Sequence, residues 1–217
     1  MPKTDPAPKH LDVATIDYNN PEYIDLENKI VEIFMDKNMS ATAEAFENAA
    51  LYAMEPVLAK FAKLTWGSDG KFVNYQCGSL KYDNPKPDKP YLISFHIGNA
   101  IAPKSIFDNK NYLKNCFFDL MNQTEEKFGA TTLYTDTWLN SLPKWLEYFP
   151  QEWIDNLGPE NKEVGWGYGH WGQFISAKGD LNKKYAKILR ETREFPFWPR
   201  ISTCSFSAMR QHLANFS

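Results

Sequence analysis

The stretch that decides the fold runs from residue 91 to residue 141 and reads YLISFHIGNAIAPKSIFDNKNYLKNCFFDLMNQTEEKFGATTLYTDTWLNS. Near its start, polar and apolar side chains alternate along the chain, which predicts a strand over 90–97. Residues 109–128 repeat apolar side chains every three or four positions and stop before Gly129, which predicts a helix. A second strand is predicted over 131–138. A strand, a helix and a strand in this order allow a parallel crossover.

The neighbouring segments extend this pattern. A strand is predicted over 71–82, and antiparallel pairing with the strand 90–97 is the simplest arrangement across the proline-rich loop between them. The other predicted elements are helices over 21–36 and 40–66, a short helix that starts at 141–143 and ends before Pro150, and a second short helix that runs through Trp153 to about Gly158. They are followed by a strand over 173–177, a helix capped by Asp180 and a last helix capped near Ser205.

The order of these elements predicts an α+β fold of mixed α/β layers, with a central sheet of four to six strands and helices packed on it. Residues 1–20 are rich in Pro and Asp, which is typical of a flexible N-terminal arm. Residues 21–217 are expected to form a single α/β domain, with a helical part over 21–66 and a sheet-containing part over 71–217.

Composition narrows the class of protein. The chain has 217 residues, 43% hydrophobic and 15% aromatic residues, and a formal net charge of −3. This charge gives no electrostatic reason to bind nucleic acid or an anionic membrane. No window approaches eighteen uninterrupted apolar residues, and the N-terminus lacks the apolar core of a signal peptide. Three cysteines without a CxxC pair favour reduced thiols and a cytoplasmic protein.

His96 and Asp136 are the candidate catalytic residues. On a pleated strand Ser94 and His96 share one face, and Tyr134, Asp136 and Trp138 share one face of the strand 131–138. An imidazole that titrates near neutral pH can act as a general base, and a carboxylate can orient it. Each residue also has a structural reading, the histidine as a packed side chain and the aspartate as a backbone cap.

The candidate substrate-binding residues are Tyr134, Trp138, His170, Trp171 and Arg200. His170 and Trp171 belong to a glycine-rich run over 165–172, where glycines let the backbone approach a ligand, although a strand rather than a helix is predicted after it. Arginine binds carboxylates and phosphates. His96, Asp136 and His170 together are an alternative metal site for iron or zinc, but no metal-binding spacing supports it, so no metal ligand is predicted.

The order of features from residue 75 to residue 213 resembles the acyltransferase-like domain found C-terminal to some GNAT-type modules. The resemblance rests on the strand 75–80 with its Gly78, the strand Ser-Phe-His-Ile at 94–97, the turn Pro-Lys-Ser at 103–105, the pair Phe-Phe at 117–118, the run Asp-Thr-Trp-Leu at 136–139 and Tyr-Phe-Pro at 148–150. It implies a GNAT-like sheet, acyl transfer and acyl-CoA as the cofactor. His96, Trp138 and Leu139 occupy marked positions of that family.

Three functions therefore remain open at the level of sequence. The first is a small-molecule transferase, with acyl transfer and His96 as the base. The second is a non-catalytic binding module with an aromatic-lined pocket, and the third is a metal-dependent enzyme that uses His and Asp. In each case the expected partner is a small molecule rather than a nucleic acid or a membrane.

Overall fold

The computed structural model describes residues 76–101, 103–162, 172–174, 176–177, 182–192 and 194–216, with the single positions 32, 36, 45, 49 and 52. The chain divides into two compact units. The first, which we call the sheet unit, comprises Asn74–Val164 and Phe197–Ser217, and the second comprises Met1–Val73 and Gly165–Pro196. The expected helices over 21–36 and 40–66 and the N-terminal arm lie outside the described residues, so the predicted domain division stays a prediction.

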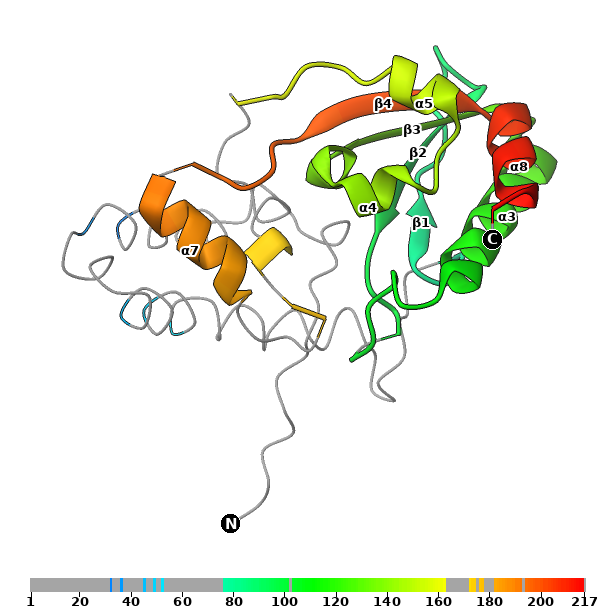
Figure 1. The fold of residues 1–217 in the computed structure, drawn as a ribbon. Coiled ribbons are helices and arrows are strands. Elements are labelled where there is room, and N and C mark those ends of the chain that lie inside the picture. The colour runs from blue at the N-terminus through cyan, green and yellow to red at the C-terminus, as the bar shows by residue number, and fades with distance from the viewer. Residues whose placement is uncertain are drawn as a thin grey trace. The chain divides into compact units, whose positions relative to one another are not determined.

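The sheet unit is built on a four-stranded mixed sheet (Figure 1). Its strands are β1 Leu80–Tyr82, β2 Leu92–Ile97, β3 Thr132–Thr137 and β4 Arg200–Ser205, and they lie in chain order. β1 pairs antiparallel with β2, β2 pairs parallel with β3, and β3 pairs antiparallel with β4. The α+β class, the antiparallel first pair and the parallel crossover are thereby confirmed.

Helix α3, Lys110–Phe128, makes the crossover between the two parallel strands. The Asn109 side chain accepts a hydrogen bond from the Tyr112 N–H and caps its first turn. Gly129, at φ 67°, ends the helix in the left-handed conformation that glycine adopts without strain. The buried residues of α3 follow the predicted spacing of three and four, and they are Leu113, Cys116, Phe117, Leu120, Met121 and Thr124.

Short helices follow β3 and close the core. They are the 3₁₀ turn η2 Trp138–Ser141, α4 Pro143–Leu146 and α5 Gln151–Asp155, and α8 Phe206–Ala214 follows β4 and packs beside α3 (Figure 1). Their aromatic side chains form one cluster with Phe95 and Phe117. Within it the rings of Phe149 and Trp153 stack at 4.2 Å. The aromatic residues thus build the core of the sheet unit.

Asn140 is the polar centre of this core. Its Oδ1 accepts hydrogen bonds from the indole N–H groups of Trp145 and Trp153, at 3.0 and 3.3 Å. Its Nδ2 donates to the carbonyl oxygens of Arg200 and Thr135, at 2.7 and 3.3 Å. A fully buried amide needs such partners, and here one side chain joins η2, α4, α5 and both strands of the β3–β4 pair.

Strand β4 has no counterpart among the sequence predictions, which placed only the capped helix in this segment. Its core-facing residues are the small Ser202 and Cys204, while Ile201 is 46% exposed. The hydrophobic pattern of β4 therefore predicts that Ile201 faces the core, whereas Ser202 and Cys204 are the residues that do. Ser202 is buried because its hydroxyl donates to the Trp153 carbonyl oxygen at 2.6 Å. The capping residue of the last helix is Ser205, as predicted.

Both outer strands of the sheet are covered at their free edges. The side-chain amide of Gln76 pairs with the main-chain N–H and C=O of Tyr82 on β1, at 3.2 and 3.0 Å. On β4, the Ile201 carbonyl accepts the Gly158 N–H, and the Thr203 carbonyl accepts Asn156 Nδ2. These contacts occupy edge groups that would otherwise pair with another chain.

In the second unit, the predicted strand over 173–177 is wrong. Gly172–Phe174 forms a 3₁₀ turn, η3, in which Gln173 and Phe174 are buried. Helix α7, Lys183–Thr192, follows, and the Tyr185 N–H donates to the side chain of Asn182. The expected cap, Asp180, lies outside the described residues.

Candidate functional site

The sheet of the sheet unit has an apolar face and a second face, which we call the site face. The apolar face carries Ile93, Phe95, Leu133 and Cys204 into the core. The site face carries side chains that remain half-buried or exposed: Ser94, His96, Tyr134, Asp136, Ile201 and Thr203. Ser94 lies opposite Tyr134 in the parallel register, so His96 and Asp136, two positions further on, correspond on neighbouring strands.

His96 is held by Asp83, which follows β1. Its Nε2 lies 2.7 Å from Asp83 Oδ2, and the two side chains are 35% and 50% exposed. The Asp83 N–H donates to the Ser94 carbonyl, which fixes the aspartate beside β2. A carboxylate only accepts, so in the neutral ring Nε2 carries the hydrogen and Nδ1 keeps its lone pair. Nδ1 makes no hydrogen bond to any residue that the structure describes.

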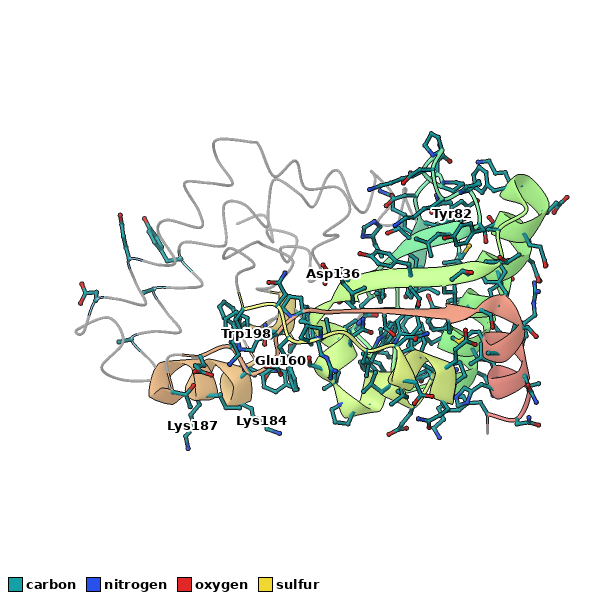
Figure 2. All side chains as sticks on the ribbon, turned by 90° about the horizontal axis from the view of Figure 1, so that it is seen from above. Tyr82, Asp136, Glu160, Lys184, Lys187 and Trp198 are labelled. Carbon is teal, nitrogen blue, oxygen red and sulfur yellow. The ribbon has the colours of Figure 1, made fainter. Side chains whose placement is uncertain are left out.

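The carboxylate that contacts His96 is therefore not the expected one. Asp136 shares the site face and the neighbouring strand with His96, but no described residue forms a hydrogen bond or an ion pair with its carboxylate (Figure 2). Partial desolvation by the surrounding protein raises the pKa of Asp136, although the side chain itself is exposed. Burial raises the pKa of Tyr134, and the charge of Asp136 raises it further.

Beside His96 the hydrogen-bond ladder between the two central strands ends. β2 and β3 pair over Leu92–Ser94 and Thr132–Tyr134, whereas the strands themselves continue to Ile97 and Thr137. Where the next rung of the ladder would form, the Thr135 hydroxyl donates to the Phe95 carbonyl at 2.9 Å. The ladder therefore ends inside the sheet rather than at one of its edges, and His96 lies on β2 beside that point.

The other predicted substrate-binding residues have different positions. Trp138 begins η2, just after β3, and its ring stacks on Phe197 at 6.1 Å. Arg200 begins β4, and its Nε donates to the Gly158 carbonyl at 2.7 Å. His170 and Trp171 lie outside the described residues. Of the predicted set, the structure places His96, Tyr134 and Asp136 together on the site face.

Two residues of this site are absent from the sequence predictions. Asp83 lies in the proline-rich loop, and nothing in the pattern of that loop indicates a contact with a histidine 13 positions later. Thr135 has the core-facing position of β3, where a threonine is an ordinary strand former. Within the described ranges, no group of three His, Cys, Asp or Glu side chains is suited to hold a metal ion. The alternative metal set includes His170, which lies outside the described residues.

Comparison of the chain with protein-family models, with curated proteins and with solved structures found no match. Among the described helices, none combines the length and the apolar character needed to cross a membrane.

Proposed function

We propose that the sheet unit carries the active site of a small-molecule transferase, with acyl transfer from an acyl-CoA as its reaction and His96 as its base. The observation that carries this proposal is the contact between His96 Nε2 and Asp83 Oδ2 at 2.7 Å, which leaves Nδ1 without a described partner. An exposed pair of this kind contributes little to stability, but it orients the ring and leaves Nδ1 available to a substrate. The resemblance to the GNAT-associated acyltransferase-like domain supports the same reaction class.

In this mechanism the chain supplies proton transfer and orientation. Asp83 holds the imidazole so that Nδ1 faces the acceptor substrate, and it stabilises the imidazolium once the ring is protonated. His96 takes a proton at Nδ1 from the acceptor's amine or hydroxyl group as that group bonds to the acyl carbon. His96 then returns the proton to the departing sulfur, which restores the neutral ring and balances the reaction. The bound acyl-CoA would supply the activated acyl group and the thiolate that leaves.

The residues present suit one part of this cofactor. The pantetheine arm of acyl-CoA is extended and contains two amide groups, and main-chain groups beyond the end of a strand ladder can pair with amides. The main-chain groups beyond Ser94 and Tyr134 would pair with this arm. The three unpaired, buried cysteines of the chain agree with a cytoplasmic location for such an enzyme.

The test is thiol release from acetyl-CoA and longer acyl-CoA esters in the presence of a panel of amines and alcohols. His96→Gln should lower kcat/KM by about 100-fold or more, because a positioned base contributes about 10²–10⁴-fold. Asp83→Asn should lower it by about tenfold or more. The matched controls are His212→Gln on α8 and Asp88→Asn in the same loop as Asp83, and both should retain activity.

Two results would overturn the proposal. One is wild-type thiol release by the His96→Gln variant. The other is the absence of thiol release from every acyl-CoA, together with an unchanged melting temperature at millimolar acyl-CoA, since a ligand of the folded state raises that temperature. Equal ligand binding by the wild type and His96→Gln, without turnover, would instead identify a binding module.

A further inference from the structure

The hydrogen-bond ladder between β2 and β3 ends before the two strands do. The Thr132 N–H donates to the Tyr91 carbonyl, which sets the alternation of a parallel pair. The rung after Tyr134 would join the Asp136 N–H to the Phe95 carbonyl, but the pairing stops at Ser94 and Tyr134. Successive N–H groups of a strand point to opposite sides. Residues 133, 135 and 137 make the bonds to β4, so the Asp136 N–H points away from β4.

The Thr135 side chain takes the place of the missing rung. Thr135 is 3% exposed and faces the core, where a hydroxyl without a partner is costly. Its Oγ1 donates to the Phe95 carbonyl at 2.9 Å. Where the next rung would form, the Phe95 carbonyl therefore bonds to a side chain, and the strand pairing gives the Asp136 N–H no acceptor in β2.

We propose that Thr135 is a positioning residue that ends the β2–β3 ladder beside His96, and that the Asp136 N–H, which the ladder leaves unused, binds a carbonyl oxygen of the ligand. The first half stands on the strand pairing and the Thr135 hydrogen bond, and the second half rests on the proposed function. A main-chain donor without an acceptor inside a sheet is rare and calls for a partner. A carbonyl oxygen is the matching acceptor, and it gains most from this donor if negative charge develops on it.

Amide hydrogen exchange followed by NMR tests the first half without a substrate. In the wild type, the Asp136 amide should exchange about 100-fold faster than the Tyr134 amide, which has a rung to β2. Thr135→Val removes the hydroxyl at nearly constant shape, so the Phe95 carbonyl becomes available and the Asp136 amide should exchange about tenfold more slowly. Thr135→Ser keeps the hydroxyl and should behave as the wild type.

Equal protection of Asp136 and Tyr134 in the wild type would overturn the role of Thr135, even if the valine variant failed to fold. For the second half, saturating acetyl-CoA should shift the Asp136 amide resonance and slow its exchange in the wild type and in Thr135→Ser, but not in Thr135→Val. Thiol release should fall about tenfold or more in kcat for the valine variant only. Acetyl-CoA that binds without affecting this amide would reject the second half, whereas acetyl-CoA that does not bind would reject the proposed function and leave the exchange result standing.

Discussion

Replacing Asn140 by leucine removes the polar centre of the aromatic core at similar volume. The two indole N–H groups that Oδ1 accepts belong to Trp145 and Trp153, both 0% exposed. Each buried donor left unsatisfied costs about 1–3 kcal/mol, so the loss of Oδ1 should cost about 2–6 kcal/mol. The carbonyls of Thr135 and Arg200 lie on paired strands and should add less. A cost of this size is a large part of the stability of a typical domain, about 5–15 kcal/mol.

Urea unfolding followed by circular dichroism measures this cost for Asn140→Leu. The matched control is Asn84→Leu, at an exposed loop position, which should change the free energy of unfolding by less than about 0.5 kcal/mol. In a Trp153→Phe background one donor is already absent, so Asn140→Leu should cost about 1–3 kcal/mol less than in the wild type. A loss below about 1 kcal/mol in the wild type, or equal losses in both backgrounds, would refute the account of Asn140 as the acceptor that both indoles require.

Three further predictions concern the sheet unit. Asp83→Asn should change the free energy of unfolding by less than about 0.5 kcal/mol, because its pair with His96 is exposed, and a larger loss by urea titration would make the pair structural. Gly78→Ala should destabilise the protein by about 1–3 kcal/mol, because Gly78 has φ 63° and an added Cβ would lie 2.6 Å from Cys116 Sγ. The melting temperature should fall accordingly, and Cys116→Ala in the same chain should recover part of that fall. Burial raises the pKa of Cys77 to about 12, so its thiolate is about one part in ten thousand at pH 8, and Ellman's reagent should label it only on unfolding.

The stretch from residue 91 to residue 141 was predictable because each of its elements buries one face. Ile93 and Phe95 alternate with polar residues, and the stripe of α3 repeats at helical spacing, so the strand, helix and strand follow from local pattern. β4 was not predictable in this way. Its core positions are small because Ser202 and Cys204 lie beneath the large aromatic cluster, and only the tertiary structure makes such residues the buried ones.

The candidate site was also only partly predictable from the sequence. The position of His96 on the site face followed from alternation along its strand. Its contact with Asp83 joins a strand to an irregular loop, and the sequence contains no periodicity that relates the two. The hydroxyl of Thr135 competes with a main-chain rung, which is a choice between two hydrogen bonds that sequence patterns do not encode.

The tautomer of His96, read from ¹⁵N chemical shifts and long-range couplings of the imidazole ring, tests the central claim most directly. The neutral ring should carry its hydrogen on Nε2 in the wild type, should lose this preference in Asp83→Asn, and should keep it in Asp88→Asn. A wild-type ring with the hydrogen on Nδ1, or one that Asp83→Asn leaves unchanged, would contradict the assignment of His96 as a base held by Asp83.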